Sequence, residues 1–208
     1  MDAASYDAWY DTARGRWIGM AEFRLLYRLL QDRPGDTLLD VGCGTGWFTR
    51  RFAEEGLLAT GLDPNSDWLA FAQIKGPPAI HWILGDARAL PFPDRSFERV
   101  VSVAALCFVE EERQAVAEIV RVTRQRFAIG WLNRTSLLYR QKGRGGGSGA
   151  YRGVRWHHPR ELLDFFSGLA VHSAIFLPSG NGVARTMERL LPHTLPWGGL
   201  VVVSGEAG

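Results

Sequence analysis

The sequence predicts a doubly wound α/β fold, with a mostly parallel seven-stranded sheet and an antiparallel strand near the C-terminus. Short apolar runs alternate along the chain with segments whose apolar residues recur at helical spacing. A glycine-rich turn directly follows the first of these runs, at the kind of position where open parallel sheets bind ligands. A chain of 208 residues, 46% hydrophobic and 22% charged, can bury a core without disulfides or metals. We therefore expect a single domain over residues 1–208.

The first half of the chain contains most of the predicted alternation. The apolar spacing predicts a helix over 20–30, which the turn Arg33-Pro34-Gly35-Asp36 ends. A strand over 37–41 then enters the turn 42–46, and the helix that follows stops at Gly56. The remaining elements expected in this half are a strand over 57–63, a helix over 67–75, strands over 80–84, 97–103 and 126–132, and a helix over 110–122.

In the C-terminal part the predicted strands and helices alternate less regularly. Residues 141–151 have the composition of a flexible segment, and a helix over 158–169 has Pro159 in its first turn. Strands over 171–177 and 200–204 can form an antiparallel edge, separated by a long insertion over 178–199. Without this late pair the sheet would be entirely parallel.

Composition excludes several classes of partner. The 24 basic and 22 acidic residues leave a net charge of +2, which argues for neither a nucleic-acid nor a membrane partner. The start of the chain lacks the pattern of a signal peptide, and no apolar run reaches the roughly 18–20 residues that span a bilayer. Two distant cysteines, Cys43 and Cys107, allow at most one disulfide, and no histidine or cysteine spacing indicates a metal site. We expect a reduced, cytoplasmic protein.

The glycine-rich turn predicts a cofactor site. Glycines at 42, 44 and 46 allow the backbone to approach a ligand closely, and the next helix points its free N–H groups at the same place. Asp63 ends the second predicted strand, where an acid can accept hydrogen bonds from both ribose hydroxyls. A dinucleotide fingerprint would need glycine at position 47, which is Trp47 here. An NAD-dependent oxidoreductase is therefore disfavoured.

Three motifs, LLDVGCGTG at 38–46, GLDPN at 61–65 and GDARALPFPDRSFERVVS at 85–102, give the sequence a recognisable family character. Over about Thr37 to Asn133 it resembles the class I S-adenosylmethionine-dependent methyltransferases, and in particular their small "type 11" group. The resemblance implies a Rossmann-like fold, S-adenosyl-L-methionine as cofactor and S-adenosyl-L-homocysteine as product. It also implies that residues 37–133 form the cofactor-binding half, and 134–208 the substrate side and last strands.

The resemblance assigns cofactor roles to two aspartates and the glycine-rich turn. Asp40 would orient the turn and the methionine amino group, and Asp63 would bind the ribose hydroxyls. The methionyl and ribose parts would be lined by Gly42, Cys43, Gly44 and Gly46. Two alternatives stay open here: Asp40 could merely tie the turn, and Cys43 reads as a small buried residue and not as a nucleophile.

The later motifs would bind the adenosine and face the sulfonium. Pro64 and Trp68 would lie beside the adenosine, although Trp68 could equally be a core residue. Asp86 would accept from the adenine amino group, with a backbone N–H donated by Ala87; a plain turn is the alternative for Asp86. The positions that would face the sulfonium side are Ala104 and Leu106.

The first 33 residues are dense in aromatic side chains. In the superfamily that this sequence resembles, such a segment often folds over the cofactor cleft, so residues 1–33 are expected to form a helical lid. Tyr10 and Trp17 are the residues expected to contact the cofactor. The alternative is an aromatic helix that packs on the sheet without reaching the ligand.

Methyl transfer requires positioning of the acceptor and, for an oxygen or nitrogen acceptor, removal of a proton. The catalytic residues are not determined by the sequence; His157 and His158 are weak candidates for a base, and both could instead cap a helix that starts at Pro159. The glycine-rich tract 143–149 favours a mobile surface loop over an RNA-binding segment.

The expected function is methyl transfer to a small-molecule acceptor. The alternatives are a non-catalytic S-adenosylmethionine-binding or regulatory module, and a methyltransferase acting on protein or RNA. The sequence contains no Asn-Pro-Pro-Tyr motif after the fourth predicted strand, which weakens the nucleic-acid and protein-glutamine readings. Neither the acceptor nor the oligomeric state follows from the sequence.

Overall fold

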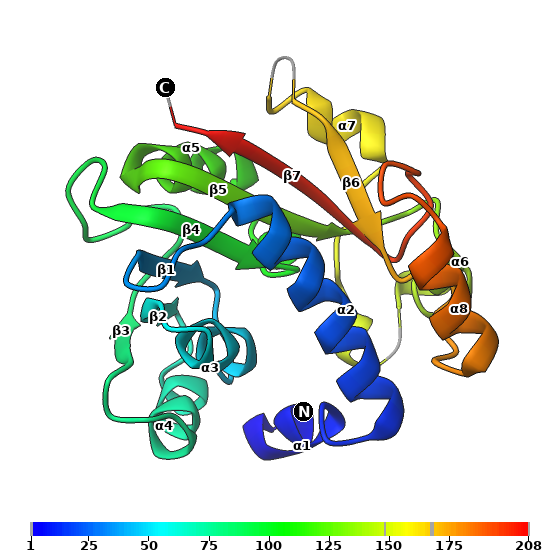
Figure 1. The fold of residues 1–208 in the computed structure, drawn as a ribbon, viewed down its shortest axis with the longest axis horizontal. Coiled ribbons are helices and arrows are strands. Elements are labelled where there is room, and N and C mark those ends of the chain that lie inside the picture. The colour runs from blue at the N-terminus through cyan, green and yellow to red at the C-terminus, as the bar shows by residue number, and fades with distance from the viewer. Residues whose placement is uncertain (1, 148, 167–168, 208) are drawn as a thin grey trace.

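The computed structural model describes residues 2–147, 149–166 and 169–207. Its strands form one seven-stranded sheet in the order β3-β2-β1-β4-β5-β7-β6 (Figure 1). The strands are β1 Thr37–Val41, β2 Leu58–Asp63, β3 His81–Leu84, β4 Phe97–Val103, β5 Thr123–Leu132, β6 Val171–Ala174 and β7 Leu200–Glu206. Strands β1 to β5 pair in parallel, while β7 runs antiparallel to both β5 and β6. The predicted fold class is confirmed.

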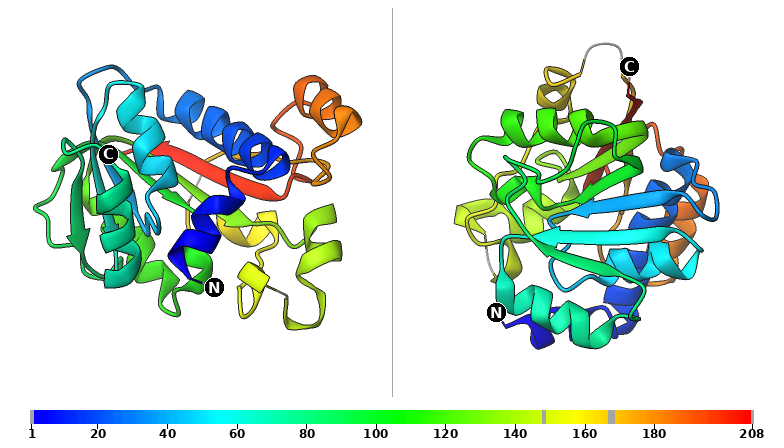
Figure 2. Two further views of the ribbon diagram at one scale, coloured as in Figure 1. Left: turned by 90° about the horizontal axis from the view of Figure 1, so that it is seen from below. Right: turned by 90° about the vertical axis from the view of Figure 1, so that its left-hand side faces the viewer.

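Helices cover both faces of this sheet (Figure 2). The helices are α1 Ala3–Trp9, α2 Ala13–Leu30, α3 Trp47–Glu54, α4 Ser66–Lys75, α5 Glu112–Val122, α6 Leu137–Lys142, α7 Pro159–Leu163 and α8 Gly182–Leu190, with short 3₁₀ turns η1 Leu106–Phe108, η2 Arg144–Gly146 and η3 Gly149–Tyr151. Successive residues of β1 alternate between two cores: Leu38 packs with α2 and α3, and Leu39 packs with α5 and α7. The alternation makes β1 part of both cores.

The N-terminal helices begin earlier than the apolar spacing predicts. Asp2 caps α1 by accepting from the Ser5 N–H at 2.8 Å, and Thr12 caps α2 by accepting from the Gly15 N–H at 3.0 Å. A Cβ on Gly15 would lie 2.0 Å from the Trp9 carbonyl oxygen, so this glycine permits the close contact between the two helices. Because arginines and glycines interrupt the apolar stripe before Met20, capping and this close contact decide where α2 starts.

The C-terminal elements also differ from the prediction. The helix expected over 158–169 is limited to α7, and residues 167 and 168 lie outside the described part of the chain. Strand β6 ends at Ala174 because Ile175 has a left-handed φ of 66°. The insertion 178–199 contains α8, for which no element was predicted. The tract 143–149 contains the turn η2, with Ser148 outside the described residues.

Two sequence-level expectations concern the chain's chemistry as a whole. Cys43 and Cys107 are both free thiols, so the single disulfide that the sequence allows does not form. Across the described residues, no helix combines the length and the hydropathy needed to cross a bilayer.

Candidate functional site

A glycine loop joins β1 to α3 at the carboxyl edge of the sheet. Gly42, Gly44 and Gly46 have φ values of 77°, 57° and 75°, in the left-handed region that favours glycine. A Cβ on Gly42 would lie 2.3 Å from the Ala105 Cβ, and a Cβ on Gly46 would lie 2.3 Å from the Trp82 ring. Side chains at these positions would collide with their neighbours, so the loop can hold this tight path only with glycine.

The loop is tied to the end of β2 and leads into an uncapped helix. The N–H groups of Gly42 and Cys43 both donate to the Leu62 carbonyl oxygen, at 2.7 and 3.0 Å. Gly46 is the N-cap residue of α3 and has no side chain to cap the helix, while Trp47 and Phe48 follow as its first two residues. Free N–H groups at a helix start attract anionic or hydroxyl groups of a ligand.

Asp63 closes the loop from the end of β2. Its Oδ2 accepts from the Gly44 N–H at 2.8 Å and its Oδ1 from the Asn65 N–H at 2.9 Å. Burial raises the pKa of this carboxyl group, whose residue is 8% exposed. A carboxylate oxygen has two lone-pair sites, so each oxygen can still accept one hydrogen bond from a ligand. Two fixed acceptors side by side suit a pair of vicinal hydroxyls.

Asp40 is a second buried carboxyl group at this edge. Its Oδ2 accepts from the Thr49 hydroxyl at 2.6 Å, and the described residues supply it with no cationic partner. Burial raises its pKa to about 7, and the nearby Asp63 adds to the effect. An unpaired carboxylate in a low-dielectric site favours a cationic group on the ligand. Its hydrogen bond to Thr49 also ties the strand to α3, as the alternative reading expected.

Asp86, after β3, lies in an ion-pair chain. Its Oδ2 is 2.6 Å from Arg88 Nη2, and its Oδ1 accepts from the Arg88 N–H at 2.8 Å. These hydrogen bonds lower the pKa of Asp86, and Arg88 also pairs with Glu111 at 2.6 Å. The turn expected as an alternative for Asp86 is present; its adenine contact, with Ala87, stays a prediction.

The residues after β4 divide between the site and the core. Ala104 has a left-handed φ of 53°, a strained conformation for a residue with a Cβ and one that clusters at functional sites. Its N–H donates to the Gly130 carbonyl at 2.8 Å. Leu106 is 1% exposed and its side chain packs in the core on the α5 face. The expected position of Leu106 on the sulfonium side of the cofactor stays a prediction.

Helix α1 lies beside α4 and reaches the glycine loop (Figure 1). The Tyr6 ring is 4.9 Å from the Trp68 ring, and the Tyr10 ring stacks on Trp47 with centroids 4.5 Å apart. Asp7, 2% exposed, pairs with Arg50 at 2.8 Å and with Lys75. These contacts hold α1 against α3 and α4. They agree with both the lid and the packed-helix readings, so the cofactor contact of Tyr10 stays a prediction.

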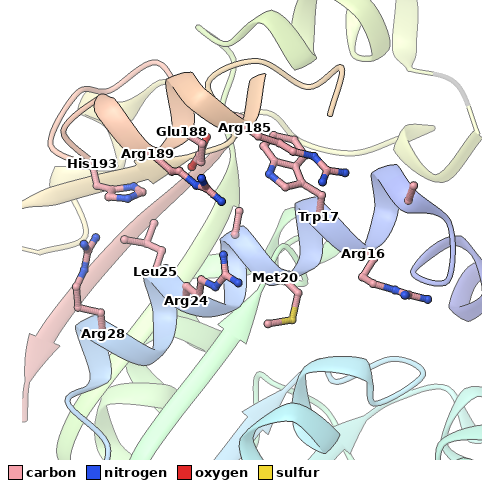
Figure 3. Close-up of a pocket in the computed structure, with 12 residues that line it drawn as sticks. Arg16, Trp17, Met20, Arg24, Leu25, Arg28, Arg185, Glu188, Arg189 and His193 are labelled. Atoms are coloured by element: carbon pink, nitrogen blue, oxygen red, sulfur yellow. The ribbon is translucent and has the colours of Figure 1, made fainter. Parts of the chain in front are cut away.

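Trp17 lies elsewhere. It lines a hollow between α2 and α8 and points toward Arg185 (Figure 3). The α2 residue that faces Tyr10 and Trp47 is Gly19, two positions on and about 200° around the helix. The expected cofactor contact of Trp17 is therefore corrected, since the direction of α2 turns this ring away from the glycine loop. Trp68, on α4, does lie on the side of the glycine loop, next to Gly44. Pro64 lies just before α4 and is exposed.

Neither candidate histidine is placed as a base. His158 caps α7: its Nδ1 accepts from the Arg160 N–H at 3.2 Å and its N–H donates to Glu161 Oε2 at 2.9 Å. His157 is buried, with Nε2 3.2 Å from Glu112 Oε1, an oxygen that also accepts from the Trp131 indole. The capping alternative is correct for His158, whereas His157 joins the loop to α5.

Glu22 is a polar residue that sequence reasoning missed. It is half-buried on α2, between the core residues Ile18 and Leu26 at i−4 and i+4. Burial raises the pKa values of Tyr6, Tyr10 and Tyr151, and the charge of Glu22 raises them further. Burial raises its own pKa to about 8. An acid at a core-facing position of a helix was the signal in the sequence.

Metal chemistry has no candidate ligands here. Over the ranges 2–147, 149–166 and 169–207, no cluster of three or more His, Cys, Asp or Glu could hold a metal ion.

The sheet order, the glycine loop after β1 and the buried acid after β2 define a Rossmann-like cofactor-binding domain. Residues 39–127 match the family described as methyltransferase domain. Over these residues the chain is similar to a methyltransferase domain.

Curated relatives match the same region. An uncharacterized protein of Mycobacterium tuberculosis is 36% identical over 170 residues, which cover 77% of this chain and 55% of the relative. The malonyl-[acyl-carrier protein] O-methyltransferase of Serratia marcescens is 36% identical over 59% of this chain and 45% of its own length. The demethylmenaquinone methyltransferase of Renibacterium salmoninarum is 36% identical over 59% of this chain and 51% of its own length. The chain thus spans about half the length of these relatives.

A solved structure matches nearly the whole fold. The SAM-dependent methyltransferase of Thermotoga maritima, described as a possible histamine N-methyltransferase, has a TM-score of 0.78 at 23% identity. The match covers 99% of this chain and 96% of that one. At this identity the likeness shows that the two chains share the fold.

Proposed function

We propose that this protein transfers a methyl group from S-adenosylmethionine to a small-molecule acceptor. The observation that carries the proposal is the glycine loop closed by Asp63, with Asp40 buried beside it and without a cationic partner. One of the relatives is named for a small acceptor, demethylmenaquinone, and another for a malonyl group on a carrier protein. These names support the reaction class and leave the acceptor of this chain to experiment.

The residues fit the hydroxyl, ammonium and adenosine groups of the cofactor. When bound, S-adenosylmethionine supplies an electrophilic methyl group on a sulfonium. Asp63 would accept from the ribose hydroxyls, and Asp40 would face the methionine ammonium. The backbone of the glycine loop would lie against the ribose and methionyl chain, in the space that a Cβ on Gly42 or Gly46 would obstruct. Trp68, Asp86 and Ala87 would contact the adenosine.

The acceptor side is argued from Glu22 and the tyrosines near it. Burial raises the pKa values of the Tyr6 and Tyr10 hydroxyls, and the charge of Glu22 adds to this effect at both. With a pKa of about 8, Glu22 is largely protonated at neutral pH and can exchange a proton with an acceptor near that pH. In this proposal these groups orient the acceptor, and the ionised form of Glu22, which grows as the pH rises toward 8, accepts the proton that an oxygen or nitrogen acceptor releases.

Calorimetric binding of S-adenosylmethionine, S-adenosylhomocysteine and NADH to the purified chain tests the cofactor assignment. We expect micromolar binding of the first two and none of NADH. Asp63→Ala should weaken binding about 100-fold, since a charged acceptor for ribose hydroxyls contributes about 1.5–3 kcal/mol. Asp67→Ala, an exposed acid in the first turn of α4, is the matched control and should bind as the wild type does. Binding of NADH alone, or of none of the three, would overturn the proposal.

Turnover is the second step of the test. The chain with S-adenosylmethionine and a panel of quinol, phenol, amine and carboxylate acceptors should form S-adenosylhomocysteine with at least one of them. Cofactor binding without turnover on any acceptor class would favour a non-catalytic binding module instead.

A further inference from the structure

A hollow of about 660 Å³ lies between α2 and α8, apart from the glycine loop (Figure 3). Its lining residues are Ala13, Arg16, Trp17, Met20, Ala21, Arg24, Leu25, Arg28, Arg185, Glu188, Arg189 and His193. The cofactor site does not use these residues. We refer to this hollow as the arginine groove.

The arginine groove is strongly cationic. Five arginines line it, and within the described part of the chain none of them has a carboxylate partner in an ion pair. The one acid, Glu188, is buried and already accepts from the N–H groups of Ile175 and Phe176, at 2.9 and 3.0 Å. Burial lowers the pKa of His172, and the positive charges of Arg28 and His193 lower it further. Ion pairs with the described residues therefore do not neutralise the positive charge of these five arginines.

The arginines stand in two rows above an apolar floor. Arg24 and Arg28 are four residues apart on α2, and Arg185 and Arg189 are four residues apart on α8, so each pair forms a row about 6 Å long. Arg24 and Arg189 extend toward each other across the groove (Figure 3). Ala21 and Leu25 are buried beneath them, with the ring of Trp17 at one end.

We propose that the arginine groove docks an acidic amphipathic helix of a partner protein. A helix with an apolar stripe would place that stripe on the partly exposed ring of Trp17 and on the narrow apolar floor above the buried Ala21 and Leu25. Carboxylates at i and i+4 on both sides of the stripe would match the two arginine rows, because a guanidinium pairs with a carboxylate through two hydrogen bonds. A free polyphosphate would satisfy the arginines but would leave the apolar floor unused, so the helix fits the groove better.

The groove has the length of a short helix. Its α2 side runs from Ala13 to Arg28, which corresponds to about 24 Å at 1.5 Å per residue. A helix of about 16 residues would cover it. The inference does not depend on the identity of the methyl acceptor or on turnover.

Fluorescence anisotropy with a labelled peptide tests the proposal. The probe is a lactam-stapled 16-residue helix with a leucine stripe flanked by glutamates, and its counterpart has lysine in place of each glutamate. We expect the wild-type chain to bind the glutamate peptide, with affinity that falls at least tenfold from 50 to 300 mM NaCl, and not to bind the lysine peptide. Failure of the glutamate peptide to bind at low salt would overturn the proposal.

Charge reversal locates the contact. The double variant Arg24→Glu with Arg189→Glu should bind the glutamate peptide at least tenfold more weakly than the wild type does. It should also bind the lysine peptide. The control double variant, Arg33→Glu with Arg160→Glu, makes the same change in net charge at exposed arginines outside the groove. Its affinity for the glutamate peptide should stay within twofold of that of the wild type. Equal losses in both double variants would show non-specific attraction and overturn the proposal. If the first variant does not fold, as judged by circular dichroism, Arg28→Glu with Arg185→Glu replaces it.

Competition separates the helix from other anions. Sodium tripolyphosphate should displace the peptide only at concentrations where its ionic strength alone has that effect. Tight binding of tripolyphosphate that depends on Arg24 and Arg189, with weak peptide binding, would replace the docking site with a polyphosphate site. Tight arginine-dependent binding of a 20-nucleotide single strand would likewise overturn the protein-helix proposal.

Discussion

The two edges of the sheet handle buried charge in opposite ways. At the amino edge, Arg99 is buried between Asp32 and Asp36, at 3.6 and 2.9 Å, and its guanidinium also donates to Gln125 at 2.7 Å. At the carboxyl edge, Asp40 is buried with a hydroxyl partner and no cation among the described residues. Burial raises the pKa of Asp32 and of Asp40 alike to about 7.

The difference indicates which edge serves the fold and which serves a ligand. A buried charge whose partner is built into the chain can stabilise one arrangement of the fold, whereas a buried acid without a cation costs stability unless a ligand compensates it.

The largest effect is expected at the amino edge. Arg99→Ala should lower the free energy of unfolding by about 3–5 kcal/mol, because it leaves Asp32 and Asp36 without their buried cation. The loss should be smaller at pH 5 than at pH 8, since Asp32 becomes protonated below its pKa of about 7. Urea unfolding at both pH values measures it. Below the unfolding transition, cofactor affinity should be unchanged.

Arg51→Ala is the control for that experiment. Arg51 pairs with Glu54 at 2.7 Å, on the exposed surface of α3. Its loss should cost less than about 1 kcal/mol, because exposed ion pairs contribute little. Equal destabilisation by the two substitutions would remove the contrast between the edges.

Glycines with positive φ at the two edges form a matched pair. Gly35, at the amino edge, has φ 91° and open space where a Cβ would lie, so Gly35→Ala should cost only the conformational strain of about 1–2 kcal/mol. Gly42→Ala adds a contact of 2.3 Å with the Ala105 Cβ and should cost about 2 kcal/mol more. Thermal unfolding and calorimetry would measure both, and cofactor binding should be lost only in Gly42→Ala. Retained cofactor binding in Gly42→Ala would contradict the role proposed for the glycine loop.

The smallest effect is a pH dependence from Asp40. Its pKa is raised from 3.8 to about 7, so the folded protein without ligand keeps this proton while the unfolded chain loses it near pH 4. Asp40 therefore makes the fold less stable as pH rises from about 4 to 7. A cationic cofactor favours the ionised form, so affinity should increase by up to about tenfold from pH 6 to pH 8. Calorimetry should show that cofactor affinity changes less with pH in Asp40→Asn than in the wild type. An equally steep pH dependence in the variant would assign it to another group.

Local patterns predicted much of the cofactor half. The strand before the glycine loop, the helix after it and Asp63 at the end of β2 follow from apolar runs, turn residues and spacing. The same reasoning recognised the turn at Asp86 and the cap at His158, because both depend on neighbours within three residues.

Predictions that depended on distant contacts were less successful. The direction of Trp17 follows from the rotation of α2 on the sheet. Glu22 became visible as a site residue only when α1, α2 and η3 were brought together. The arginine groove depends on α8, an amphipathic helix that the sequence analysis left inside the long insertion 178–199.

The sequence by itself determined the class of fold, the glycine loop and the acids at its strand ends, since short-range sterics and periodicity specify these features. Only the tertiary structure decided which aromatic rings meet the loop, which acids remain unpaired and which arginines face one another. Those outcomes depend on how helices rotate and pack against a sheet, and residues far apart in the chain contribute equally to that packing.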